Sequence, residues 1–142
     1  MQRMTTGLPA MTRRLVDAPT YVVLTTLNVD GSPQSSVVWV RRDGDDLLMS
    51  TIRGRLKTRN MDRDPRVTVC AYDPADPFQY VEVRGTVTLD DRGGDALIDE
   101  LNRKYIGDSW TVRPGEERVV VRLTPTRVIE HVAAQSPASG RT

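Results

Sequence analysis

Cysteine and histidine are almost missing from this chain, which has one of each in 142 residues, Cys70 and His131. A single cysteine excludes an intramolecular disulfide and a thiolate-based zinc site, and a single histidine leaves little for a histidine-ligated metal. We therefore expect no metal centre. Because Cys70 lies within an apolar run, we expect it to be a buried structural residue. We expect His131 to be a surface or packing residue, with a general acid or base as the alternative.

Long apolar runs and an excess of one charge are also missing. No segment approaches the roughly 20 apolar residues that a membrane span needs, and residues 1–14 lack the apolar stretch of a signal peptide. We therefore expect a cytoplasmic protein with no membrane partner. The 20 Lys+Arg residues nearly balance 19 Asp+Glu residues. Since neutralising nucleic-acid phosphates needs a surplus of basic residues, nucleic acid is not an expected partner either.

Lysine is scarce, because 18 of the 20 basic residues are arginine and only Lys57 and Lys104 are not. The two side chains bind anions differently, so an isolated lysine in such a chain calls for an explanation. We expect Lys104 to lie on the exposed side of a helix, where its replacement should have no effect on ligand binding.

We expect Trp39 and Trp110 to pack in hydrophobic clusters, with stacking on a ligand ring as the alternative.

Short β-rich runs separated by turn signals make up most of the chain. Apolar and polar residues alternate most regularly over 80–89, which predicts a strand with one apolar face. Strands are predicted at 20–27, 34–41, 47–52, 66–72, 80–89 and 118–132, the last one broken at Pro125. Helices are predicted at 8–18, 56–63 and 94–105. Six strands with three short helices predict a mainly β fold, an antiparallel barrel, in a single domain over 1–134 with an unpacked tail over 135–142.

A basic turn at 53–60 carries the strongest functional signal. Gly54 permits a sharp turn, and the start of the predicted helix presents free backbone N–H groups and the positive end of the helix dipole. Arg55 can bind two oxygens as a planar fork, and Lys57 adds a compact charge. Four basic side chains and two neutral donors therefore predict a phosphate site: Arg53, Arg55, Lys57, Arg59, Thr58 and Asn60. The alternative is a solvated helix face whose charges pair with nearby carboxylates such as Asp62.

Two segments resemble the pyridoxamine 5′-phosphate oxidase-like superfamily of split β-barrel proteins: TTLNVDGSPQSSVVWV at 25–40 and STIRGRLKTRNMDRDPRVTV at 50–69. Members of this superfamily bind flavin mononucleotide (FMN) or the deazaflavin coenzyme F420. Within the second segment, residues 57–66 (KTRNMDRDPR) are similar to the small deazaflavin-dependent oxidoreductases. The resemblance implies a six-stranded antiparallel split β-barrel of the FMN-binding type, assembled as a homodimer.

The resemblance also implies which residues hold the cofactor. The basic turn would bind the phosphate, through Arg55, Lys57, Thr58 and Asn60. The end of the third strand would lie along the pyrimidine side of the ring, at Ser50, Thr51 and Ile52. The second strand would border the same pocket, with Gln34, Ser35, Ser36 and Val37. A partner subunit would complete the site, with Tyr80 and Trp39 as candidates.

The sequence contains no convincing nucleophile, metal cluster or general-base constellation, so we predict no catalytic side chain. In such an enzyme a bound cofactor carries the chemistry, while the protein supplies position, electrostatics and exclusion of water. We therefore expect an F420-dependent oxidoreductase that transfers a hydride between the deazaflavin and a small, conjugated organic substrate. Two alternatives stay open: an FMN-dependent enzyme like pyridoxamine 5′-phosphate oxidase, and a non-catalytic flavin- or deazaflavin-binding protein.

Overall fold

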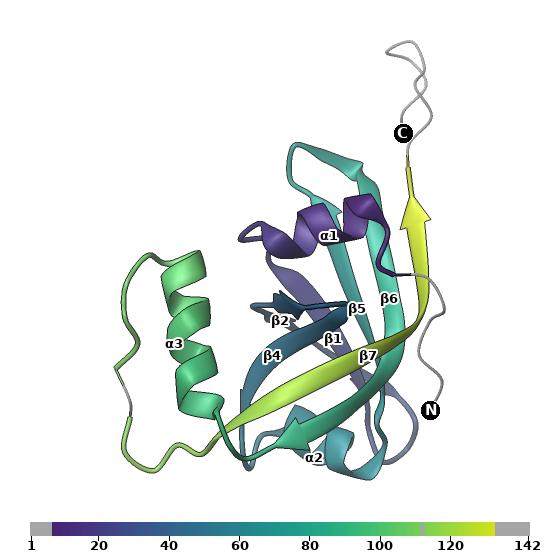
Figure 1. Cartoon of the computed structure of the whole chain (residues 1–142). Coiled ribbons are helices and arrows are strands. Elements are labelled where there is room, and N and C mark those ends of the chain that lie inside the picture. Colours follow the sequence, from purple (N-terminus) through teal and green to yellow (C-terminus); the bar gives the residue numbers. More distant parts are fainter. Residues whose placement is uncertain (1–6, 112, 133–142) are drawn as a thin grey trace.

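Seven strands form one antiparallel sheet in the computed structural model, which describes residues 7–111 and 113–132 (Figure 1). The elements in chain order are α1 (Ala10–Asp17), β1 (Val22–Leu27), β2 (Pro33–Val38), β3 (Arg41–Asp43), β4 (Asp46–Ile52), α2 (Leu56–Arg63), β5 (Arg66–Asp73), β6 (Asp76–Asp90), α3 (Gly94–Tyr105) and β7 (Arg118–His131). The mainly β fold class is therefore confirmed, with seven strands in place of the six predicted. The tail predicted at 135–142 lies outside the described residues.

The order of the strands requires the sheet to curl. That order is β2-β1-β5-β6-β7-β4-β3, so β2 and β3 stand at opposite ends, yet only two residues separate Val38 from Arg41. Three residue steps span about 11 Å at most, whereas the edges of a flat seven-stranded sheet would lie about 29 Å apart. The sheet must therefore close on itself, and Figure 1 shows its long strands strongly curved.

The strand predicted over 34–41 divides into β2 and β3 because Val40 bonds to a helix. Its N–H donates to the Tyr105 hydroxyl oxygen at 3.0 Å, and its carbonyl oxygen accepts from Lys104 Nζ at 2.7 Å. Both partners belong to α3. Since these side chains take the place of a neighbouring strand, the ladder ends at Val38 and a new strand begins at Arg41.

Pro125 does not break the last strand, contrary to the prediction, because a bulge accommodates it. β7 continues through this position, and its register against β6 shifts where Gly85 faces Pro125. A Cβ atom on Gly85 would collide with the carbonyl oxygen of Thr124. The glycine and the bulge together keep β6 and β7 paired on both sides of the proline.

The inner face of the sheet forms the apolar core. The alternation predicted for 80–89 is confirmed, because Val81 and Val83 are at most 1% exposed. β5 follows the same rule, with Val69 pointing inward and Cys70 pointing outward into solvent. The expectation of a buried Cys70 is therefore wrong. A run of apolar residues does not show whether a second layer covers the outer face of its strand, and here Cys70 stays exposed.

The helices cover the openings and one side of the barrel. α2 and α3 have the predicted bounds, and α1 is slightly shorter than predicted. Figure 1 places α1 and α2 near opposite ends of the barrel and α3 beside β4 and β7. Leu97 and Leu101 of α3 pack on Leu48 of β4. In the part of the chain that the structure describes, no helix is both long and apolar enough to cross a membrane.

Candidate functional site

A cavity of about 260 Å³ lies where the end of β2, the start of α2, α3 and the segment that follows α3 meet. Its polar lining is basic, with Arg55, Lys57, Arg113 and Arg118, together with Ser50. The remaining walls are aromatic or apolar: Tyr21, Val37, Val38, Trp39, Ile98, Leu101 and Trp110. Basic and aromatic side chains around one cavity suit a ligand with an anionic group and a planar ring.

The turn into α2 brings Arg55 and Lys57 to this cavity. Gly54 has a φ of 95°, a left-handed conformation that favours glycine. Arg55 is the N-cap residue, and its carbonyl oxygen accepts the helical bond from Arg59 N–H at 3.1 Å. The backbone N–H groups of residues 56–58, in the first turn of α2, have no acceptor within the helix. They therefore add partial positive charge to the N-terminal end of α2.

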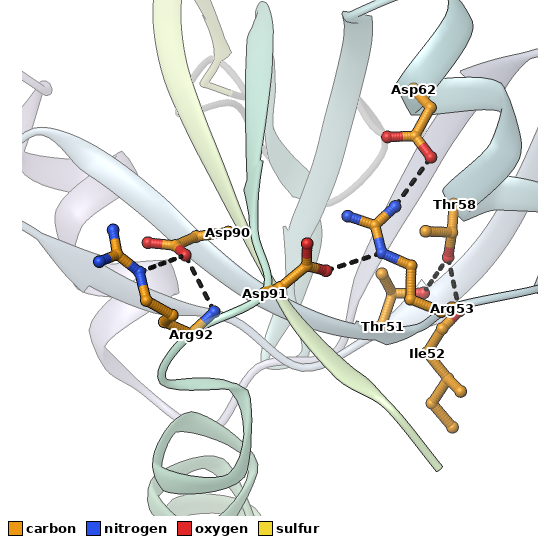
Figure 2. A network of polar contacts seen from close by, with 8 residues as sticks. All are labelled: Thr51, Ile52, Arg53, Thr58, Asp62, Asp90, Asp91 and Arg92. Carbon is orange, nitrogen blue, oxygen red and sulfur yellow. Dashed lines mark hydrogen bonds and ion pairs between the residues drawn. The ribbon is translucent and has the colours of Figure 1, made fainter. Parts of the chain in front are cut away.

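Only part of the basic turn pairs with the protein's own carboxylates. Arg53 bonds to Asp62 and to Asp91, each at 2.8 Å (Figure 2). Within residues 7–111 and 113–132, neither Arg55 nor Lys57 forms an ion pair with a carboxylate. The alternative, in which the basic charges pair with nearby carboxylates, is therefore correct for Arg53. It is wrong for Arg55 and Lys57, which line the cavity.

Lys57 extends from α2 toward β2. Its Nζ donates to Ser36 Oγ at 3.2 Å. The pKa of Lys57 is lowered, first because burial penalises its charged form and then because Arg55 and Arg118 are nearby cations. An anion in the cavity would oppose all three effects. This lysine is therefore poised to gain a counter-ion that the described part of the protein does not supply.

Thr51, Ile52 and Thr58 hold the start of α2 against β4 and do not line the cavity. The Thr58 hydroxyl donates to the Ile52 carbonyl oxygen at 2.8 Å and lies 2.9 Å from the Thr51 hydroxyl (Figure 2). Both threonines are 1% exposed. In this arrangement their hydroxyls fix the helix in place, and Ser50 is the residue of this strand end that faces the cavity.

Asn60 lies on the same inner side of α2 and is fully buried. Its amide nitrogen donates to Thr26 Oγ1 at 3.0 Å and to Asn28 Oδ1 at 2.9 Å, both at the end of the first hairpin strand. Its amide oxygen accepts from Arg63 at 3.1 Å. These bonds tie α2 to β1, so the side chain of Asn60 positions the helix that carries Lys57.

The residues predicted along β2 also fall into two groups, those at the cavity and those that bond to a neighbouring strand. Ser36 bonds to Lys57, and Val37 lines the cavity with 65% of its surface exposed. Gln34 and Ser35 instead bond across the hairpin to β1, each at 2.8 Å, and lie outside the cavity lining. The structure thus brings Ser36, Val37, Ser50, Arg55 and Lys57 together, while the other predicted residues support them.

Three residues of the cavity come from the segment after α3 and the start of β7: Trp110, Arg113 and Arg118. The sequence predicts ligand stacking for Trp110 only as the alternative to packing, and it does not assign the two arginines to the site. The guanidinium of Arg118 lies 4.9 Å from the Trp110 ring and that of Arg113 lies 5.2 Å from it. Trp110 is anchored by its backbone N–H, which donates to Asp99 at 2.9 Å. The available signal was a tryptophan and an arginine in a loop, followed by an arginine at the start of the next strand, but local patterns do not show which part of the fold these side chains contact.

Trp39 is held in the cavity wall by α3. Its ring stacks on Tyr105 at 5.2 Å with an interplanar angle of 10°. Next to it, Lys104 donates to the carbonyl oxygens of Val16 and Val40, and burial lowers its pKa to about 8. The expectation of an exposed Lys104 is therefore wrong. Lys104 follows Leu101 by three residues, which puts it on the packed face of the helix.

The curved antiparallel barrel agrees with the split β-barrel that the sequence resemblance implies. The chain matches the family model described as pyridoxamine 5′-phosphate oxidase over residues 8–132, so it belongs to this family. The superfamily resemblance is confirmed. Membership of this family supports a redox function with a flavin-like cofactor.

Several solved structures share this fold. An F420 reductase is 31% identical, with 86% of this chain and 98% of that chain covered and a TM-score of 0.78. A conserved hypothetical protein from Mycobacterium tuberculosis is 19% identical over 99% of both chains, with a TM-score of 0.72. The General Stress Protein 26 from Bacillus anthracis is 21% identical, with 83% of this chain and 88% of that chain covered and a TM-score of 0.65. The last two similarities concern the fold alone.

Proposed function

We propose that this protein is an F420-dependent oxidoreductase, which transfers a hydride between the deazaflavin and a small, conjugated organic substrate. The observation that carries the proposal is the pair Arg55 and Lys57, two cations at a helix start that line one cavity and lack carboxylate partners among the described residues. The 31% identity to an F420 reductase favours the deazaflavin over FMN. Family membership keeps FMN as the second candidate.

Each cavity residue has a role in this proposal. Arg55 binds phosphate oxygens through its planar fork, and Lys57, oriented by Ser36, adds a point charge. The aromatic walls at Trp39 and Trp110 accommodate a planar ring and exclude water. The bound coenzyme supplies the hydride chemistry. The protein therefore contributes binding, orientation and a shielded space, and no side chain has to act as a nucleophile.

We also propose that the protein is a homodimer. The outward faces of the adjacent strands β1, β5 and β6 expose Val23, Tyr72 and Tyr80, at 37%, 52% and 40%. Tyr80 stacks on His131 of the same chain at 4.7 Å. Exposed apolar side chains on neighbouring strands are typical of an interface. Tyr80 is then the candidate for completing the partner's site, since Trp39 lines the cavity of its own chain.

A fluorescence titration of the purified protein with F420 and, separately, with FMN tests the proposal. We expect tighter binding of F420. Tighter binding of FMN would favour the second candidate, and failure of both would overturn the phosphate site. Catalysis is distinguished from storage by mixing the complex of reduced F420 with a small quinone and following the return of the absorbance of oxidised F420. A rate no faster than that of free reduced F420 would indicate a carrier protein.

A further inference from the structure

Arg118 is a cation with a largely buried side chain, and the described part of the protein satisfies it only in part. It begins β7, pairs with Ile52 of β4, and lines the same cavity as Arg55 and Lys57. Only 10% of its side chain is exposed. Across residues 7–111 and 113–132, its Nε atom has no hydrogen-bond partner. The Trp110 ring, 4.9 Å away, packs on the guanidinium and restrains its position.

The partners that Arg118 does have are distant. Nη2 lies 3.3 Å from a carboxylate oxygen of Glu116, and Nη1 lies 3.4 Å from Ser50 Oγ. Charge-assisted hydrogen bonds are shorter, at about 2.7–2.9 Å. The pKa of Arg118 is lowered, chiefly by burial and further by Arg55 and Arg113, although Glu116 acts in the opposite direction. A buried charge without full compensation favours the entry of an anion.

Among residues 7–111 and 113–132, Glu116 is the one carboxylate that forms ion pairs with the cations of this cavity. The segment Arg113-Pro114-Gly115-Glu116 has the sequence and the positive φ at Gly115 (84°) that are typical of a type II turn, closed by a backbone bond of 3.3 Å. The turn places the Glu116 carboxylate 4.0 Å from Arg113 as well as 3.3 Å from Arg118. Glu116 is 25% exposed and does not line the cavity of Arg55 and Lys57; it lines a neighbouring cavity, and Arg118 belongs to the lining of both.

We infer that Arg118 forms a second oxyanion subsite of the cavity and that Glu116, from the neighbouring cavity, is the internal counter-ion of this arginine, which an oxyanion of the ligand replaces. The subsite takes a phosphate or a carboxylate group, because either one presents the paired oxygens that a guanidinium binds. The inference extends the proposed function to a second anionic contact in the same cavity. A permanent structural ion pair makes the opposite prediction, because removing Glu116 would then loosen the loop and weaken binding.

The decisive comparison is between Glu116→Gln and Glu117→Gln. Both variants remove one negative charge from neighbouring positions, but Glu117 follows the turn, is exposed, and forms no ion pair with Arg118 in the described part of the chain. The probe is inorganic phosphate, followed by calorimetry and by the emission of Trp110 and Trp39 at a constant ionic strength of about 0.15 M, where distant charges are screened. We expect Glu116→Gln to bind phosphate about fivefold more tightly than Glu117→Gln.

Arg118→Met, combined with Glu116→Gln, should abolish this gain. Three results would overturn the inference: the two glutamine variants bind phosphate equally well, Glu116→Gln binds it more weakly than Glu117→Gln, or neither variant binds it. The comparison of Glu116→Gln with Glu117→Gln tests the inference even if the Arg118 variant does not fold. A parallel titration with acetate identifies which oxyanion the subsite prefers.

Titrations of the same glutamine variants with F420 and with FMN separate this inference from the proposed function. If neither coenzyme binds while Glu116→Gln still gains affinity for phosphate, the subsite stands and the proposed function falls. If F420 binds the wild-type protein tightly and the two glutamine variants do not differ for any probe, the proposed function stands and the subsite falls.

Discussion

Replacing Lys57 with alanine is the most direct test of the phosphate site. The ammonium group is partly buried, bonds to Ser36 at 3.2 Å, and has no carboxylate partner among the described residues. Its loss should remove one hydrogen bond to a charged group, which contributes about 1.5–3 kcal/mol. The dissociation constant for F420 should therefore rise roughly 10- to 150-fold, as measured by fluorescence titration at physiological salt.

Arg59→Ala is the matched control. Arg59 lies on the same helix and carries the same charge, but it is exposed, donates to the Gly54 carbonyl oxygen, and does not line the cavity. Its removal should change the affinity by less than about threefold, which is the scale of a screened surface charge. Similar losses in both variants would show that only the overall charge matters. An unchanged affinity in Lys57→Ala would refute the phosphate site.

The pH dependence gives a second measurement on the same residue. Burial and two neighbouring cations lower the pKa of Lys57 below its ordinary value of 10.5, and an anion binds only its charged form. The affinity for F420 should therefore fall as the pH rises through this lowered pKa. Lys57→Arg stays charged throughout this range and should lose the dependence. A dependence that persists in Lys57→Arg would assign the titration to another group, such as Lys104 with its pKa of about 8.

Further predictions concern two residues that support the site and one on the proposed dimer interface. Lys104→Met should lower the free energy of unfolding by about 2 kcal/mol in urea, because two backbone carbonyls lose their donor. The stability of the wild-type protein, and not of this variant, should rise between pH 8 and 10.5, since the unfolded state binds more protons there. Asn60→Ala should cost about 2–3 kcal/mol of stability, and a loss of F420 affinity without a loss of stability would instead indicate direct phosphate contact. Tyr72→Glu should shift the light-scattering mass from dimer to monomer, and an unchanged dimer would place the interface elsewhere.

The sequence predicts those parts of the fold whose causes are local. α2 has the predicted bounds because Gly54 permits the turn before it and Pro65 follows its end. The alternation over 80–89 predicts the buried face of β6 because one face of a strand follows directly from its period of two. The same local signals predict that Arg55 and Lys57 stand at a helix start, and both line the cavity.

The features that the sequence does not predict depend on contacts between distant segments. β2 ends at Val38 because the partners of Val40 come from α3, more than 60 residues later. Lys104 is packed because two carbonyl oxygens, of Val16 and Val40, lie within its reach. Arg118 joins Arg55 in one cavity because β7 pairs with β4, and no local pattern encodes that pairing.

Within α2, the positions of the basic residues matter more than their number. Successive residues are about 100° apart around a helix, so Lys57 and Arg59 lie about 200° apart and face nearly opposite directions. Lys57 accordingly reaches Ser36 and the cavity, while Arg59 turns back to Gly54. Thr58, between them, is 1% exposed against β4, and Leu56 is 48% exposed. Position 57 therefore suits a long, flexible cation that can reach the cavity while its stem stays partly buried, and Arg59 cannot replace Lys57 when that side chain is removed.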